Sequence, residues 1–409
     1  MNILLINHYA GSLRHGMEYR PYYLAREWTR LGHRVRILAS DQSHIRAEAP
    51  RLLGRARLDE TIDGIEYTWF ATPAYRGNGV GRVRNMGAFV LRLLREARAL
   101  AAGFAPDLVI ASSTYPADIW PAHRIARLAG GRLLFEVHDL WPLSPMELGG
   151  FSKWHPFIML LQAAENYACR NADAVVSILP KVRAHLEAHG MAEHKLHIVP
   201  NGIDPAEWLA QALATRPPCC APIDALRARG LFVLGYAGTH GVANALDTLL
   251  DAARLMRGEP LAIVLVGGGP DKARLQQRAR AEQLGNIHFF DPVPKTDVPA
   301  LLAAFDAAYI GWKRQPLYRF GISPNKLIDY MMAARPVLHA VEAGNDPVAE
   351  AGCGLTVAPE DAPALAGGLR ALAALPAPAR AAMGQRGRDF VLANLSYEVL
   401  GQRFLEASQ

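Results

Sequence analysis

The stretch Arg319-Phe-Gly-Ile-Ser-Pro-Asn-Lys-Leu-Ile-Asp-Tyr-Met-Met-Ala-Ala-Arg-Pro-Val-Leu338 predicts a helix with a well-marked start. Ser323 is a favoured N-cap residue and Pro324 a favoured first helical residue, so we expect the helix to run from Pro324 to about Ala334. Apolar residues at helical spacing would form its buried side: Leu327, Met331 and Met332. The N-terminus of this helix would therefore be open to a ligand.

Charged and polar side chains gather at this helix start. A helix N-terminus presents unpaired backbone N–H groups and partial positive charge, and here Lys326 and Arg319 add two cations beside Ser323 and Asn325. Asp329 follows further along the helix, where its carboxylate could accept two hydrogen bonds from a vicinal diol. The combination suits the diphosphate and the ribose of a nucleotide. The alternative is a surface helix whose charges are merely solvated.

The rest of the chain alternates between short apolar strands and amphipathic helices. The predicted strands lie at 2–7, 35–39, 107–111, 132–139, 174–178, 197–200, 231–238, 260–270, 286–290, 306–310 and 355–357, and residues 61–70 alternate as a strand or hairpin would. Strand–helix–strand units imply parallel sheets that bind ligands at the carboxyl ends of their strands. With 409 residues, the chain is long enough for two such domains of about 200 residues each.

The boundaries follow from breaker residues and from the last helical pattern. The turn Val199-Pro-Asn-Gly-Ile-Asp204 separates a domain of residues 1–200 from a domain of residues 201–386. The C-terminal segment 387–409 has apolar residues at helical spacing, so we expect one helix from Gly387 to Ala407.

Two further places carry candidate site residues. His138 and Asp139 follow an apolar strand, so they would lie at a strand's carboxyl end, although a histidine there is often only a structural hydrogen-bonding group. Gly16 ends the loop after the first strand, where it would let the backbone approach a phosphate or serve as a simple turn glycine. The loop lacks the G-x-G-x-x-G pattern, so dinucleotide binding is disfavoured.

Composition narrows the possible partners. The net charge of +6 permits an acidic partner, but the arginines are scattered and there is no basic tail or zinc-finger spacing, so we expect no nucleic acid. Four cysteines without ligand spacing predict neither a metal site nor disulfides. The start of the sequence lacks a signal-peptide pattern, so we expect a cytoplasmic protein.

The second half of the sequence resembles the family 4 retaining glycosyltransferases. Their nucleotide-binding helix has the form E/D-Y/A-M-A-x-G-x-P-V, which Asp329-Tyr-Met-Met-Ala-Ala-Arg-Pro-Val337 matches. The resemblance covers nearly the whole chain and implies the GT-B fold, two facing Rossmann-like domains with a cleft between them. It implies an acceptor domain at 1–200 and a nucleotide-sugar donor domain at 201–386, joined at the family's interdomain signature 199–204, and a C-terminal helix at 387–409 that returns to the first domain. The version Phe320-Gly-Ile-Ser-Pro-Asn-Lys-Leu327 is similar to bacterial members that build O-antigen and capsule sugars, including fucosamine transferases.

The sequence departs from the family at two places. The family's first glutamate, which touches the donor sugar, is replaced by Gly321. Its arginine and lysine for the donor diphosphate, in G-R-x-x-x-x-K-G, are replaced by Thr239 and Asn244. The resemblance therefore requires positive charge from elsewhere. Lys326 is our first candidate, ahead of Arg319, Lys313 and Arg314.

The remaining roles are carried over from the family onto matching positions. Gly238 and Gly241 would let the backbone approach the diphosphate, and main-chain atoms of Val293 would recognise the base. His138 would contact the donor sugar near the reacting carbon, with Asp139 beside it. Lys326 would stabilise the leaving diphosphate.

The resemblance implies transfer of a sugar, with retention, to a lipid-linked saccharide for O-antigen, lipopolysaccharide or capsule. We expect a UDP-linked amino or deoxy sugar as donor, no cofactor, no metal ion, and peripheral contact with the inner membrane through basic and apolar helices at 83–103 and 153–168. Two alternatives remain open: a nucleotide-sugar 2-epimerase and a catalytically silent nucleotide-sugar binding module.

Overall fold

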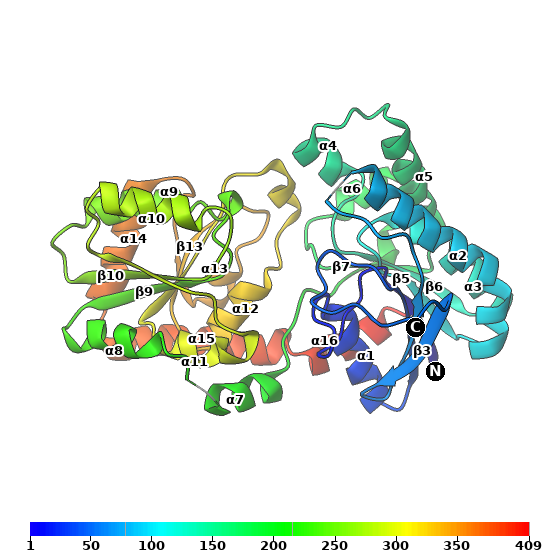
Figure 1. The fold of residues 1–409 in the computed structure, drawn as a ribbon, viewed down its shortest axis with the longest axis horizontal. Coiled ribbons are helices and arrows are strands. Elements are labelled where there is room, and N and C mark those ends of the chain that lie inside the picture. Colours follow the sequence, from blue (N-terminus) through cyan, green and yellow to red (C-terminus); the bar gives the residue numbers. More distant parts are fainter. Residues whose placement is uncertain (78, 215, 409) are drawn as a thin grey trace. The chain divides into compact units, whose positions relative to one another are not determined.

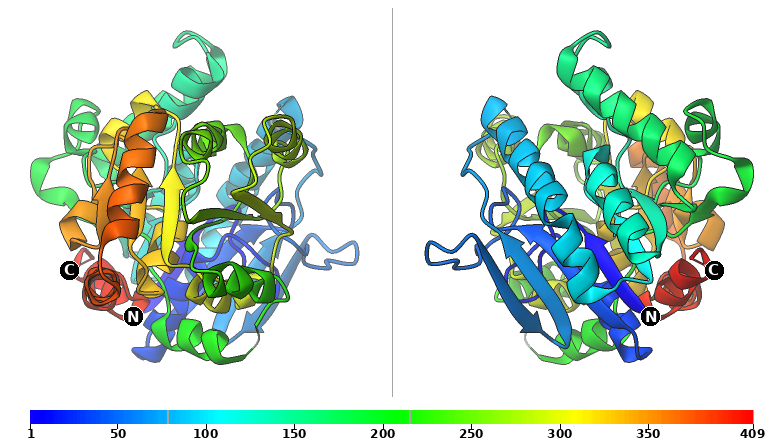
Figure 2. Two further views of the ribbon diagram at one scale, coloured as in Figure 1. Left: turned by 90° about the vertical axis from the view of Figure 1, so that its left-hand side faces the viewer. Right: turned by 90° about the vertical axis from the view of Figure 1, so that its right-hand side faces the viewer.

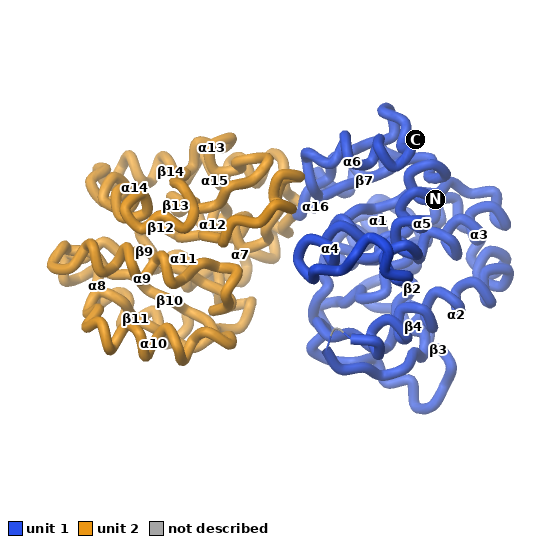
Figure 3. Tube along the Cα trace, turned by 90° about the horizontal axis from the view of Figure 1, so that it is seen from above, with its two compact units in different colours: residues 1–201, 397–409 blue, residues 202–396 orange. Residues whose placement is uncertain are grey.

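A computed structural model describes residues 1–77, 79–214 and 216–408. The chain forms two compact units, one of Met1–Asn201 with Tyr397–Gln409 and one of Gly202–Ser396 (Figure 3). We call them unit 1 and unit 2. The boundaries predicted from the sequence fall after residues 200 and 386, whereas the units divide after Asn201 and Ser396.

Unit 1 begins with a strand and ends with the last helix of the chain. Its strands are β1 (Asn2–Ile6), β2 (Arg34–Ser40), β3 (Arg57–Ile62), β4 (Ile65–Phe70), β5 (Leu108–Ala111), β6 (Arg132–Val137), β7 (Ala174–Ser177) and β8 (Leu196–Ile198). Its helices are α1 (Arg20–Arg30), α2 (Val80–Phe104), α3 (Ile119–Ala129), α4 (Leu143–Gly149), α5 (Pro156–Asn171), α6 (Arg183–Ala188) and α16 (Tyr397–Glu406).

The sheet of unit 1 has the order β3-β4-β2-β1-β5-β6-β7-β8. All neighbours are parallel except β3 and β4, which form an antiparallel hairpin at one margin of the sheet (Figure 2). The strand order reverses between β1 and β5, and ligands of doubly wound sheets bind at such a point. Helices cover both faces, with α1 and α16 on one side and α2, α3 and α5 on the other (Figure 1).

Unit 2 repeats this plan with six strands. They are β9 (Phe232–Ala237), β10 (Leu261–Val266), β11 (Ile287–Phe290), β12 (Ala307–Gly311), β13 (Val337–Ala340) and β14 (Gly354–Thr356). Its helices are α7 (Pro205–Ala214), α8 (Cys220–Ala228), α9 (Leu246–Leu255), α10 (Lys272–Ala281), α11 (Val298–Ala303), α12 (Asn325–Met332), α13 (Pro347–Ala351), α14 (Ala362–Ala374) and α15 (Ala377–Asn394).

The sheet of unit 2 is parallel throughout, in the order β11-β10-β9-β12-β13-β14. Its strands are almost wholly apolar because both faces are covered, by α9, α10 and α14 on one side and by α8, α11 and α15 on the other (Figure 1). The strand order reverses between β9 and β12. The prediction of two doubly wound parallel-sheet domains is confirmed.

Two predictions about helix ends are wrong. Helix α12 begins at Asn325 with Pro324 in the N-cap position, and no side chain caps it. Pro324 has ψ of 125°, an extended conformation, so Ser323 lies one residue too early to be the N-cap. The buried side is as predicted, since Leu327, Met331 and Met332 are all buried.

The expected single helix from Gly387 to Ala407 is two helices, α15 and α16, separated at Leu395 and Ser396. Helix α16 belongs to unit 1, where the Trp28 indole N–H donates to the Gly401 carbonyl at 3.0 Å. Phe404 packs against the same indole, with ring centroids 5.1 Å apart. Over the described ranges, no helix has the length and hydrophobicity needed to cross a bilayer.

Candidate functional site

Unit 2 contains a pocket of about 450 Å³ where β9, β10 and β11 end and α12 begins. We call it the Lys326 pocket. Five of the predicted residues line it: Gly238, Thr239, Val293, Lys326 and Asp329. The structure therefore brings the turn after β9, the turn after β11 and the first turns of α12 to one place.

The Lys326 ammonium lies at the end of β9. It donates a hydrogen bond to the Tyr236 hydroxyl at 2.9 Å and lies 4.2 Å from the centroid of that ring. A longer contact of 3.4 Å joins it to Asn244 Oδ1. Asn244 occupies the family's lysine position, so the cation in this protein approaches the same place from α12.

The turns after β9 and β10 accept only glycine. Gly238 has φ of +155°, and a Cβ atom there would lie 2.7 Å from the Lys326 ammonium nitrogen. Gly267 has φ of +153°, and its Cβ atom would lie 1.9 Å from the Gly238 carbonyl oxygen. Glycine at both positions lets the two strand ends and the lysine pack directly against one another.

Burial shifts the pKa values of the two charged groups of the pocket, Lys326 and Asp329, in opposite directions. It lowers the pKa of Lys326 to about 8. It raises the pKa of Asp329 to about 6, against the opposing charge of Lys295. Near neutral pH both groups are therefore largely ionised, and one helix presents a cation and an anion three residues apart. A diphosphate and a diol would satisfy the two groups.

The residues that hold this pocket in shape were not predicted from the sequence. The Tyr330 hydroxyl accepts from the Ala237 N–H at 3.0 Å and donates to the Ala237 carbonyl at 3.2 Å, which joins α12 to the end of β9. The Tyr236 hydroxyl donates to the Thr239 carbonyl at 2.7 Å. Tyr330 directly follows Asp329 in the helix motif, and this position in the motif is the sequence signal that could have identified it.

His240 lies behind these glycine turns and was given no role from the sequence. It is fully buried, and neither ring nitrogen has a partner among the residues that the structure describes. Burial, with smaller contributions from Lys272 and Lys326, lowers its pKa to about 4, so the ring is neutral at neutral pH. A neutral imidazole supplies both a donor and an acceptor at this place.

Four predicted residues do not line the pocket. The Arg319 guanidinium donates to the Pro316 carbonyl at 2.6 Å and lies 4.4 Å from the Phe320 ring centroid, within its own loop. Asn325 is exposed at the start of α12, and Ser323 precedes the helix. Gly241 precedes a short 3-10 helix at Val242–Asn244. Lys326 is thus the cation that the structure places at the pocket.

Gly321 explains why the family's first glutamate is missing. Its φ is +97°, a conformation that side chains with a Cβ atom rarely adopt. Asn345 holds the neighbouring backbone, because its side chain accepts from the Ile322 N–H at 2.7 Å and donates to the Ile322 carbonyl at 3.1 Å. A glutamate at this position would require a different loop conformation.

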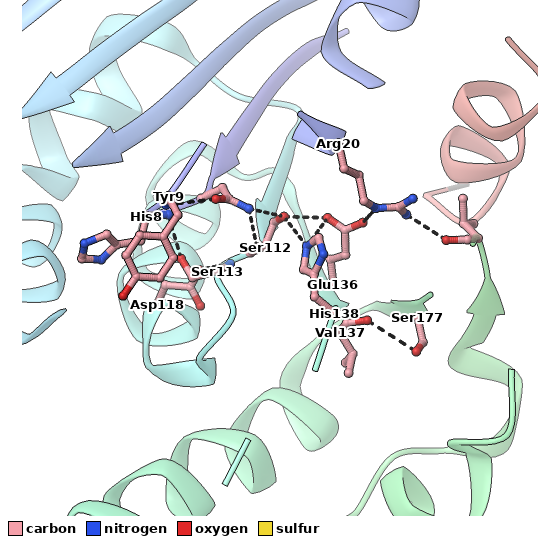
Figure 4. A network of polar contacts seen from close by, with 12 residues as sticks. His8, Tyr9, Arg20, Ser112, Ser113, Asp118, Glu136, Val137, His138 and Ser177 are labelled. Atoms are coloured by element: carbon pink, nitrogen blue, oxygen red, sulfur yellow. Dashed lines mark hydrogen bonds and ion pairs between the residues drawn. The ribbon is translucent and has the colours of Figure 1, made fainter. Parts of the chain in front are cut away.

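Unit 1 has a buried polar network where β1, β5 and β6 end (Figure 4). Its centre is Glu136, whose carboxylate pairs with Arg20 at 2.8 Å and accepts from the Ser112 hydroxyl at 2.6 Å. Arg20 also donates to the carbonyls of Val199 and Pro200. We call these residues, with His138, the Glu136 network.

His138 is held by this network through one ring nitrogen. Its Nε2 atom lies 3.3 Å from Glu136 and 3.1 Å from the Ser112 hydroxyl. Within the described residues Nδ1 has no hydrogen-bond partner, so it is the ring atom left for a ligand. Asp139 is exposed and lies outside the network.

In the Glu136 network, charge pairing affects the pKa values of Glu136 and His138 more than burial does. Burial alone would raise the pKa of Glu136, but Arg20 and His138 hold that pKa well below its usual range. Burial alone would lower the pKa of His138, but the charge of Glu136 and its hydrogen bond raise it above its usual value. The Glu136 carboxylate is therefore held in its ionised form by Arg20 and His138.

Gly16 is accounted for by local packing. It pairs with Ser12 across a tight loop, and a Cβ atom at Gly16 would lie 2.9 Å from the Ala47 backbone nitrogen. The turn interpretation thus explains this glycine without a ligand. Its contact with a substrate stays a prediction.

We expect Glu136→Gln to destabilise unit 1 by about 3–5 kcal/mol, because it leaves the buried Arg20 charge unpaired. Urea unfolding followed by tryptophan fluorescence measures the change. The control is Glu259→Gln, which breaks an exposed pair with Arg370 at 2.7 Å and should change the midpoint little. Equal midpoints for the two variants would contradict the importance of the buried pair.

Both halves of the chain match glycosyltransferase families. Residues 15–202 match the Glycosyl transferase 4-like domain, and residues 232–374 match Glycosyl transferases group 1. The chain is 28% identical over 263 residues to WcaI of Escherichia coli (strain K12), which is named as a colanic acid biosynthesis glycosyl transferase. This match spans 62% of the chain and 62% of the length of that relative.

Solved structures share the fold over nearly the whole chain. Sucrose-phosphate synthase from Thermosynechococcus elongatus superposes with a TM-score of 0.72 at 16% identity, covering 99% of this chain and 97% of its own. HepE from Anabaena, solved with UDP-glucose, gives 0.65 at 16% identity, with 99% and 98% covered.

WaaG, a glycosyltransferase involved in lipopolysaccharide biosynthesis, gives a TM-score of 0.64 at 16% identity, covering 99% of this chain and 98% of its own. The structural matches show the fold, and the family matches indicate that the protein is a glycosyltransferase. Together with the two doubly wound sheets, they place this chain among the glycosyltransferases of the GT-B type.

Proposed function

We propose that this protein transfers a sugar from a UDP-sugar to a lipid-linked saccharide, with retention of configuration, during assembly of a surface polysaccharide such as O-antigen, lipopolysaccharide or capsule. The relatives support the class of reaction: WcaI is named for colanic acid biosynthesis and WaaG for lipopolysaccharide biosynthesis. The O-antigen-like sequence before Leu327 supports an amino or deoxy sugar as the group transferred.

The observation that carries this proposal is the pairing of Lys326 and Asp329 in one pocket. A nucleotide diphosphate offers an anion for the lysine and a ribose diol for the carboxylate, and the glycine turns let backbone N–H groups approach the phosphates. Val293 lies at the pocket wall, where its main chain would meet the base. HepE was solved with UDP, which supports uridine.

Catalysis would rest on stabilising the leaving diphosphate rather than on a metal ion or a cofactor. The Lys326 ammonium has three N–H donors, of which one contacts Tyr236 and one faces Asn244, so a third is available to a phosphate oxygen. This bond strengthens as negative charge develops on the leaving group. His138 would offer Nδ1 to the donor sugar, with the exposed Asp139 beside it.

The epimerase alternative is weakened by the state of Glu136. That reaction needs carboxylates free to abstract and return a proton, and Glu136 is locked between Arg20 and Ser112. Of the carboxylates that the sequence suggests for this reaction, only Asp139 and Asp329 then remain, and an epimerase needs several.

One assay separates the three functions. The protein is incubated with a panel of labelled nucleotide sugars and with membranes that contain lipid-linked acceptors, and both lipid and nucleotide products are analysed. A labelled glycolipid supports the proposal, an epimerised nucleotide sugar indicates an epimerase, and binding without turnover indicates a silent module. A thermal-shift panel of nucleoside diphosphates, in which UDP should give the largest increase in Tm, tests the base independently.

We expect Lys326→Ala to lower kcat by about 100-fold or more, because it removes a bond that strengthens in the transition state. Asp329→Asn should mainly raise the Kd for the donor, since it weakens a contact to the ribose that does not change during the reaction. Arg280→Ala, which removes an exposed cation of unit 2, is the control. Near-normal kcat in Lys326→Ala would assign the diphosphate to another group.

UDP binding should weaken as the pH rises through about 8, the pKa of Lys326. A bound anion raises the pKa of Lys326, so Lys326 loses its proton at lower pH in the free protein than in the complex. Above about pH 8 the affinity for UDP therefore falls, by at most about tenfold per pH unit. Calorimetry from about pH 7 to about pH 9 measures this slope. In Lys326→Ala the slope should disappear; if it persists, a different group titrates.

We also propose that the protein works on the cytoplasmic face of the inner membrane, in peripheral contact through unit 1. Exposed apolar side chains gather on α4, α5 and the loop between them: Leu148, Phe151, Trp154, Met159 and Leu160. Lys153 lies 5.1 Å from the Trp154 ring centroid, and exposed arginines of α2 add positive charge at 84, 95 and 98. This composition suits an anionic lipid surface.

Trp154→Ser should reduce co-sedimentation with vesicles that contain anionic lipid, because the exposed indole is lost from the proposed contact. Leu213→Ser in unit 2, where the side chain is 89% exposed, is the matched control. Equal binding of both variants would place the membrane contact elsewhere, or nowhere.

A further inference from the structure

A second group of polar side chains lies in unit 1, on α5 and α6, and takes no part in the Glu136 network. Glu165 comes from α5, and His185 and His189 come from α6 and its C-terminal cap. One ligand atom from each residue lies within 4.8 Å of the others. We call these three residues the Glu165 triad.

The local structure explains why these side chains meet. His185 and His189 are four residues apart, so they project from the same face of α6, and their ring centroids are 4.5 Å apart. Glu165 is only 2% exposed. A carboxylate so deeply buried requires strong compensation, by a cation or by several hydrogen bonds.

The distances between the donor atoms are close to those of a metal site. His185 Nε2 lies 2.9 Å from one oxygen of Glu165, and His189 Nε2 lies 3.8 Å from the other. Ligands bonded to a tetrahedral zinc ion at 2.0–2.1 Å are about 3.3 Å apart. The donor atoms all lie within 4.8 Å of one another, so side-chain movements of up to about an ångström would bring three donors onto one ion.

One hydrogen-bond arrangement around His189 leaves its Nε2 atom free for such a bond. The Gln162 amide nitrogen lies 2.8 Å from Glu165 Oε2, 2.9 Å from Asn166 Oδ1 and 3.1 Å from His189 Nδ1. It has only two hydrogens for these three atoms. If it donates to the two oxygens, His189 Nδ1 carries its own hydrogen and donates to Asn166 Oδ1 at 2.9 Å.

In that arrangement the Nε2 atom of a neutral His189 carries a lone pair and faces a carboxylate oxygen. Two acceptors that face each other repel, and a cation between them removes the repulsion. A metal-bound histidine commonly has its other ring nitrogen fixed by an amide, carbonyl or carboxylate oxygen, and Asn166 provides such an oxygen here.

We propose that Glu165, His185 and His189 bind a divalent transition-metal ion of the zinc class. Two imidazoles and one carboxylate suit zinc and its neighbours rather than calcium or magnesium, which prefer oxygen ligands. The His185 and His189 side chains remain 13% and 25% exposed, so water can complete the coordination. The ion would join α5 to α6 and stabilise unit 1.

The first test measures binding of zinc alone to the untagged, full-length protein after treatment with a chelator. Calorimetry should show one equivalent of Zn²⁺ bound per chain, and a 100-fold excess over the Kd should raise Tm by about 5 °C or more. With Co²⁺ in place of zinc, visible absorption typical of a cobalt–imidazole site should appear. Absence of a stoichiometric site would overturn the proposal and leave the triad as a hydrogen-bonded link.

Matched variants locate the site. Glu165→Gln and His189→Gln preserve side-chain size and should weaken zinc binding by more than the 10–100-fold that loss of an outer-shell partner costs. His194→Gln alters an exposed histidine of the same unit and should bind zinc like the unchanged protein. Unchanged binding in both triad variants, or equal loss in all three, would refute the assignment. Circular dichroism of the metal-free variants checks that they fold.

Discussion

The hydrogen bond between the Lys326 ammonium and the Tyr236 hydroxyl is the contact on which the unit 2 pocket depends. It holds a partly desolvated cation at the end of β9, where two glycine turns leave room for it. A cation held in this way costs desolvation free energy that a bound anion can offset. The pocket is therefore arranged for a charged ligand rather than for its own stability.

The Glu136 network in unit 1 shows the opposite use of charge. Arg20 and Glu136 are both fully buried and satisfy each other, with two backbone carbonyls and a serine hydroxyl completing their hydrogen bonds. Such a pair has little to offer a ligand, but it fixes the ring of His138 at the end of β6. One nitrogen of that ring is held inside the network, and the other is left without a partner in the described part of unit 1.

The two departures from the family pattern are linked to structure in different ways. Asn244 stands where the family has a lysine, and it faces the ammonium of Lys326. The positive charge thus comes from α12 but lies at the position that the family's lysine would occupy. Gly321 stands where the family has a glutamate, and its φ is +97°, a conformation that favours glycine. The first departure keeps a cation at the same place in the fold, whereas the second places a glycine with a left-handed backbone at the other position.

The sequence by itself determined the two doubly wound sheets, because apolar strands that alternate with amphipathic helices leave few other packings. It also placed Lys326 and Asp329 on one helix face, since residues three apart in a helix are neighbours. Helix ends were harder to predict. The Ser-Pro pair predicted that α12 starts at Pro324, one residue before its observed start at Asn325, because an extended Pro324 cannot be distinguished from a helical one by residue type.

Only the tertiary structure decided which distant residues meet. Tyr236 and Lys326 are 90 residues apart, and Arg20 and Glu136 are 116 apart, so their contacts depend on strand order and register rather than on local pattern. Arg319 was the next candidate after Lys326 in the sequence, and its guanidinium bonds to its own loop. The His-x-x-x-His spacing at 185–189 was visible in the sequence, but its carboxylate partner comes from another helix. Local propensities act over a few residues, whereas a site is assembled by the packing of whole elements.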